Sequence, residues 1–361
     1  MLSKQNSEIL PEINIEVKQS ILQSLRDEFG GNAICLPDSQ EKLKLSNLMH
    51  WHSFSEDFDE TLLQLFLSVS DITTKRVFPC AIESLKIRNA MAENRSGIPI
   101  VGIFLPLVAD ILSLSHAFSF YYSEYFCYAG EVSKLRRYEF KFCQPSFTET
   151  GIDMDCHPNV KNRMLANIMA SISIKWVLLH ETGHHHFDHL KNIECVRLFA
   201  RDNKFCSEPI DYQKMEFEAD VWAVLHILNE FEVIELYVKK CYSRRISKLD
   251  VVKIIYLSII MPLLVVDEGI TDKNMKLVDH PSSMHRQVTI TSAFRDFFRQ
   301  ADNHQLQREL CSLYKKRGSQ ELFTDAVEYF YRDMDLMVGI NEKNAKAIDA
   351  LFGNWLMSMF S

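Results

Sequence analysis

The amino-acid sequence predicts a mainly helical α+β protein, in which a small β-sheet precedes a long central helix and helical lobes lie at both ends. Three observations predict this class. Apolar residues recur at 3- and 4-residue spacing along most of the chain, strand-like alternation with aromatic enrichment is confined to one region, and a long apolar helical pattern follows that region. We therefore expect an N-terminal helical lobe over 1–95, a central domain over 96–300, and a C-terminal helical cap or docking segment over 301–361.

The composition is that of a folded protein with no obvious affinity for polyanions. Of the 361 residues, 47% are hydrophobic, and the formal net charge is −8. Nucleic-acid binding needs a basic face, so we expect no nucleic-acid partner. The nine cysteines lack CxxC spacing, which favours reduced thiols in a reducing compartment. Because the N-terminus has no basic stretch followed by an apolar one, we expect a cytoplasmic protein.

Two apolar runs, over 98–109 and 254–266, raise the question of membrane insertion. Each contains a proline and is bounded by charged residues. A spanning helix needs about 20 apolar residues, and both runs are shorter. We therefore expect them to be buried core segments, with no membrane insertion.

Three helices are expected before residue 96. Residues 17–29 place their apolar side chains on one stripe and are followed by Gly30-Gly31, a typical helix stop. Residues 57–68 and 81–94 also have helical spacing, and Ser96-Gly97 would end the last helix. This part of the chain carries no chemical signature.

Between 98 and 143 the pattern changes to short strand-like pieces, over 98–104, 117–130 and 136–142. They come directly before the histidine-rich helix. Two interpretations are open: the sheet has an edge strand that pairs with an extended peptide, or it is purely structural.

Residues 163–190 are expected to form one long helix with a buried face, and that helix carries the sequence HETGH. On a helix, His180 and His184 lie one turn apart on one face, so both imidazoles can bind one metal ion. Glu181, one residue further round, would face the open side of the metal and serve as a general base. Gly183 costs about 1 kcal/mol relative to alanine inside a helix, which indicates that another segment approaches closely there.

A catalytic zinc site needs a third protein ligand, and the candidates lie in a helix expected over 212–231. Glu216 shares its face with the small residues Ala219 and Ala223, whereas Glu218 shares its face with Lys214. We therefore predict Glu216 as the third ligand. Asp220, one turn further along, would accept the free N–H of a ligand histidine.

A third element, HPSSMHR over 280–286, completes a recognisable order. HExxH, then ExxxD, then HPxxxxR resembles the zinc metalloproteases of the CAAX-prenyl-protease and HtpX type. The first two elements are also similar to the ImmA/IrrE-type and Lit-type peptidases. The resemblance spans roughly 172–286 and implies a zincin-like catalytic core in the central domain. It also implies that His280 donates to the oxyanion and that Arg286 braces the carboxylates of the ExxxD helix.

Other polar residues near HETGH are weaker candidates. On a continuous helix His185 points away from the ligand face, and we expect His185, His186 and His189 to take no part in the chemistry. Asp188, at i+4 from His184, would lie on the ligand face. After Arg286 we expect further helices, over 288–299, 305–316, 321–338 and 343–360.

These features together predict a zinc-dependent endopeptidase that acts on a protein or peptide substrate. His180, His184 and Glu216 would hold Zn²⁺, and Glu181 would be the general base. One alternative is a zinc-binding sensor or interaction protein on the same scaffold without hydrolytic activity, which would need a fourth protein ligand such as Asp188 or His185. The other alternative is a hydrolase of non-peptide substrates.

Overall fold

The computed structural model is mainly helical with one small mixed sheet, which confirms the predicted α+β class. It describes residues 14–31, 33–35, 65, 68–69, 77–83, 87, 89–112, 114–115, 119, 160–191, 195–197, 209–242, 246–268 and 283–300. The helices are α1 (Ile15–Phe29), α5 (Val160–His186), α6 (Pro209–Leu228), α7 (Phe231–Tyr242), α8 (Lys248–Glu268) and α9 (Ser283–Arg299), with the short helix η4 (His189–Lys191). The strands are β1 (Ala33–Cys35), β2 (Phe78–Ile82), β3 (Ala90–Arg95), β4 (Ile98–Phe104) and β5 (Cys195–Arg197).

The five strands form one sheet in the order β1-β2-β4-β3-β5. β2 and β4 are parallel, and the other neighbouring pairs are antiparallel. β3 and β4 form a hairpin whose two-residue turn, Ser96-Gly97, has positive φ at both positions, 52° and 78°. Such a turn matches the twist of a hairpin.

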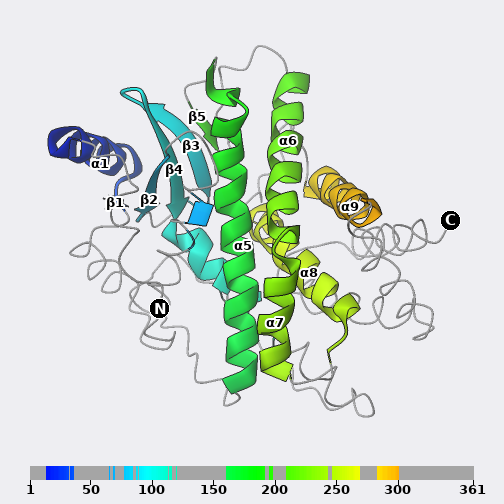
Figure 1. Cartoon of the computed structure of the whole chain (residues 1–361). Coiled ribbons are helices and arrows are strands. Elements are labelled where there is room, and N and C mark those ends of the chain that lie inside the picture. Colours follow the sequence, from blue (N-terminus) through cyan, green and yellow to red (C-terminus); the bar gives the residue numbers. More distant parts are fainter. Residues whose placement is uncertain are drawn as a thin grey trace.

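The sheet lies between α1 and α5 (Figure 1), and alternate strand residues serve the two sides. On β4, Ile100 and Phe104 pack with α1, whereas Val101 and Ile103 join the larger core that includes α5. α1 ends as expected, because Gly30 adopts a left-handed conformation with φ of 68° and its N–H caps the helix.

α5 is the central element of the fold (Figure 1). It contacts the sheet on one side and α6, α7 and α8 on the others. Its apolar residues are buried nearly all round, as expected of a helix surrounded by protein. α9 packs against α6 and α8. The apolar run over 254–266 lies within α8, and its described side chains belong to the core, as predicted. Within the described residues, no helix combines the length and the apolar character needed to cross a membrane.

One of the expected elements is wrong. The helix predicted over 81–94 does not exist: its two ends belong to strands β2 and β3, and Ser96-Gly97 is a hairpin turn rather than a helix stop. The chain before residue 96 is therefore not purely helical, and its strands share a sheet with β4. The strand predicted over 98–104 is confirmed as β4, and the rest of the apolar run over 98–109 is helical, within residues 105–112.

Several expected elements lie outside the described residues. These are most of the helix over 57–68, all of the strand over 117–130 except residue 119, the strand over 136–142, and the three helices after residue 304. The helix expected over 288–299 is present as the main part of α9. The division into parts at 95 and 300 stays a prediction.

Candidate metal centre

The candidate centre lies where α5 and α6 cross, and Gly183 permits the crossing. A Cβ atom at this glycine would lie 3.3 Å from Cα of Ala219 and 3.4 Å from its Cβ. Such spacing is tighter than ordinary van der Waals contact, so the glycine allows α6 to approach α5 at this turn. The close approach predicted from the sequence is confirmed, and the small residue on α6 is the predicted Ala219.

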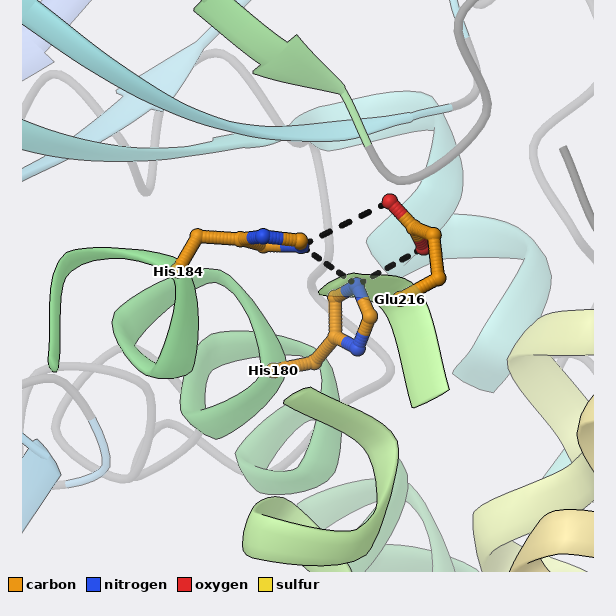
Figure 2. Close-up of side chains that lie close together, drawn as sticks. All are labelled: His180, His184 and Glu216. Carbon is orange, nitrogen blue, oxygen red and sulfur yellow. Dashed lines mark hydrogen bonds and ion pairs between the residues drawn. The ribbon is translucent and has the colours of Figure 1, made fainter. Parts of the chain in front are cut away.

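This crossing brings three potential metal ligands together (Figure 2). His180 and His184 extend from α5 and Glu216 extends from α6, and one ligand atom from each lies within 4.8 Å of the others. The Nε2 atoms of the two histidines are 3.2 Å apart. The carboxylate of Glu216 lies 3.3 Å from Nε2 of His180 and 3.6 Å from Nε2 of His184. All three residues are fully buried.

The two glutamates of the EFEAD sequence have different surroundings. Glu216 is directed into the centre, whereas the side chain of Glu218 is 41% exposed and contacts His189 and Lys214. Glu216, which shares its face of α6 with small residues, therefore lies beside the histidines, as the helical spacing predicted.

Asp220 and Arg286 support the His180 side of the centre. Arg286 donates two hydrogen bonds to the Asp220 carboxylate, at 2.6 and 2.9 Å. Nδ1 of His180 lies 2.9 Å from the same carboxylate. Nη2 of Arg286 is also 3.3 Å from this Nδ1, but when Nδ1 carries a proton both nitrogens are donors, and Asp220 accepts from both. The hydrogen bond from Nδ1–H of His180 to Asp220 leaves Nε2 of His180 directed at the centre.

Arg286 is itself held within the protein. Its side chain is 2% exposed, and its guanidinium lies 5.5 Å from the ring centroid of Trp176, within the range of a cation–π contact. Its Nη1 lies 3.6 Å from Glu216. Burial raises the pKa of Asp220, but the charge of Arg286, together with the hydrogen bonds from His180 and Arg286, outweighs burial and lowers this pKa overall. The Asp220 carboxylate therefore stays ionised beside His180.

Glu181 lies close to these charged side chains, and its carboxylate has an unusual environment for a charged group. It is fully buried, and neither of its carboxylate oxygens has a hydrogen-bond partner in the structure. Burial raises the pKa of Glu181 to about 8. A carboxyl group with a pKa near neutrality can both accept and release a proton, which is the property required of a general acid–base residue.

The two histidines differ in their affinity for a proton. Burial and the charge of Arg286 lower the pKa of His180, but hydrogen bonds to the carboxylates of Asp220 and Glu216, together with the charge of Asp220, outweigh them and raise this pKa to about 9. The pKa of His184 is held well below its ordinary value, first by burial and then by the charges of neighbouring histidines. The two carboxylates therefore favour the protonated form of the His180 ring.

The end of α5 differs from the prediction. The helix stops at His186, and Asp188 has a φ of 59°, in the left-handed region. Asp188 is therefore not at the helical i+4 position relative to His184. Instead, the reversal places Nδ1 of His189 3.0 Å from Nδ1 of His184. The helix predicted to run on to residue 190 would not allow this contact, and no signal of residue spacing reveals it.

The other candidate histidines lie away from the centre or outside the described residues. His185 contacts the carbonyl oxygen of Ile100 through Nε2, at 2.9 Å, and so links α5 to the sheet. His186 stacks on Trp222 of α6. His280 lies outside the described residues, so its predicted role stays a prediction.

Comparison with known protein families gives one result for this chain. The family described as Peptidase U49 matches residues 115–307, more than half of the chain. The chain belongs to the Peptidase U49 family. This membership supports a proteolytic function, so the protein is a hydrolase that acts on protein substrates. The matched region includes α5, α6 and α9, which carry all the residues of the candidate centre.

No curated protein and no solved structure matches the chain. The family membership and the clustering of His180, His184 and Glu216 are therefore the two findings that bear on the function.

Proposed function

We propose that this member of the Peptidase U49 family is a zinc-dependent endopeptidase with a zincin-like core. The observation that carries the proposal is the convergence of His180, His184 and Glu216 at one buried point, with the carboxylate of Glu181 beside it. Two imidazoles and one carboxylate are a donor set typical of catalytic zinc, which keeps a fourth position for water or substrate. Among the described residues, the group of potential ligands contains these three members.

The balance of buried charge also fits a divalent cation. Three carboxylates, those of Glu181, Glu216 and Asp220, surround the centre together with one guanidinium, that of Arg286. Metal binding would displace the protons of His180 and Glu181, and the group would then have a net charge of −2, because three negative charges are offset by one positive charge. Uncompensated buried charge is costly, and a divalent metal ion would neutralise it. The same carboxylates that raise the pKa of His180 would attract that ion.

Each residue would have a distinct part in peptide hydrolysis. When bound, zinc would supply Lewis acidity, which polarises the scissile carbonyl and lowers the pKa of a nearby water to about 7. Glu181 would accept a proton from the attacking water and transfer it to the leaving amine. Asp220, oriented by Arg286, would hold His180 with its Nε2 directed at the metal.

His280 is proposed, from the resemblance of HPSSMHR to the metalloprotease element, as a donor to the developing oxyanion. It lies outside the described residues, so the support is the sequence pattern alone. A donor in this place would stabilise charge that develops only in the transition state.

The test separates metal binding from chemistry. Glu181→Gln removes the proton acceptor but none of the three ligands, so the variant should bind zinc as the wild type does and should lose cleavage by at least ~100-fold, the lower range for a general base. Expression of the wild type and of Glu181→Gln in the same cells, followed by a proteome-wide search for new N-termini, would reveal the substrate. Removal of zinc by a chelator should abolish cleavage, and added zinc should restore it.

A second pair of variants tests the ligand set. Glu216→Gln should lose zinc, whereas Glu218→Gln, two residues away and half-exposed, should retain it. If Glu181→Gln still cleaved, the catalytic assignment would be wrong. If the wild type bound zinc and cleaved nothing, the zinc-binding interaction protein would be the correct interpretation instead.

A further inference from the structure

His184 has a second contact that the proposed function does not use. Its Nε2 faces His180 and Glu216, while its Nδ1 lies 3.0 Å from Nδ1 of His189. Nε2 of His189 in turn lies 3.1 Å from a carboxylate oxygen of Glu218. A continuous chain of polar contacts therefore runs from the candidate metal centre through His189 to Glu218.

The chemistry of the last group determines the direction of every hydrogen bond in this chain. An ionised carboxylate only accepts hydrogen bonds, so Nε2 of His189 must carry a proton to donate to Glu218. A neutral His189 then has an unprotonated Nδ1, which accepts from Nδ1–H of His184. A neutral His184 with its proton on Nδ1 has a free lone pair on Nε2, the atom that faces the other two ligands.

The reverse donor–acceptor order along this chain of hydrogen bonds is unfavourable. It would place a proton on Nε2 of His184, where the ring could not bind a metal, and it would bring a lone pair of His189 against the carboxylate of Glu218. The two histidines of the HETGH sequence thus have different supports. Asp220, fully buried, contacts His180 directly, whereas Glu218, 41% exposed, acts on His184 through an intervening ring.

We propose that His189 and Glu218 are positioning residues for His184, which select its Nδ1–H tautomer and direct its Nε2 at the metal. The inference rests on the proposed function, since it takes His184 to be a metal ligand. Loss of a hydrogen-bond partner behind a ligand histidine typically weakens metal binding by about 10- to 100-fold. The left-handed conformation of Asp188 makes the contact possible, because it ends α5 and turns the chain back toward His184.

The first experiment measures the dissociation constant for zinc by competition with a chelator. His189→Leu should raise it about 10- to 100-fold. His189→Asn should bind more tightly than His189→Leu, because its amide oxygen can accept from Nδ1 of His184. Glu218→Leu should weaken binding and Glu218→Gln should not, since the glutamine oxygen accepts the same bond. The matched control is Lys214→Ala, which removes only the exposed partner of Glu218 and should change nothing.

The second experiment needs neither zinc nor activity. In protein labelled with ¹⁵N-histidine, NMR should find the proton of neutral His184 on Nδ1 in the metal-free wild type, and His189→Leu should reduce the population of that tautomer. An Nε2–H tautomer in the wild type, or equal zinc affinity of the wild type and His189→Leu, would overturn the inference. Absence of zinc binding by the wild type would instead refute the proposed function, and the metal-free tautomer would still decide this inference.

Discussion

Substitution of Gly183 by alanine tests whether the spacing of α5 and α6 controls the metal centre. A methyl group at this position would lie 3.3 Å from Cα of Ala219 and 3.4 Å from the ring of Trp222, so α6 must move by a few tenths of an ångström. Ala219 lies between Glu216 and Asp220 in the sequence of α6. Displacement of the helix there would therefore carry both carboxylates away from the histidines.

Two effects oppose each other in the free energy of unfolding. Alanine in place of glycine stabilises a helix by about 1 kcal/mol, and overpacking of a close contact costs about 1–3 kcal/mol. We expect a net destabilisation of about 0–2 kcal/mol, measured by urea unfolding, with a rise of about 10-fold in the dissociation constant for zinc, as for other disturbances of ligand orientation.

A double substitution provides the control. Adding Ala219→Gly to Gly183→Ala removes the Cβ atom at 3.4 Å and should restore part of the zinc affinity, although glycine in α6 costs about 1 kcal/mol of stability. The coupling between the two sites follows from a double-mutant cycle. The reasoning would be refuted by a Gly183→Ala variant that is more stable by about 1 kcal/mol and binds zinc as tightly as the wild type.

Two further predictions concern the supports of the centre. Asp220→Asn removes the carboxylate that accepts both hydrogen bonds from the buried guanidinium of Arg286, and it should lower the free energy of unfolding by about 3–5 kcal/mol. Glu230→Gln breaks a partly exposed ion pair and should cost under about 1 kcal/mol. Equal costs in the two variants would contradict the role of burial. Asp188→Val should destabilise by about 1–2 kcal/mol because a β-branched residue is strained at φ of 59°. It should also weaken zinc binding by moving His189, whereas Asp188→Gly, which adopts this φ without strain, should be more stable than Asp188→Val in thermal unfolding.

The residue spacing predicted the part of the centre that depends on single helices. His180 and His184 are one turn apart because α5 is a regular helix over that stretch. The choice of Glu216 over Glu218 followed from which face of α6 carries small side chains, and the close approach at Gly183 confirmed that face. Both predictions depend only on the 3.6-residue period of a helix, which is a local property of the chain.

Residue spacing predicted the wrong secondary structure where pairing with strands distant in sequence decides the conformation. Residues 90–95 contain alanine, methionine, glutamate and arginine, all good helix formers, yet they form β3 because β4 and β5 pair with it on both sides. Short segments of this kind are ambiguous in periodicity, and a neighbouring strand distant in sequence resolves the ambiguity.

By itself, the sequence determined the histidine pair, the glutamate between them and the helix face that carries Glu216, the proposed third ligand, because helical geometry relates those residues locally. Only the tertiary structure decided what lies behind each histidine. Arg286 reaches Asp220 from α9, and His189 reaches His184 after the left-handed turn at Asp188. The first contact depends on how three helices pack, and the second on a backbone reversal that residue spacing does not encode.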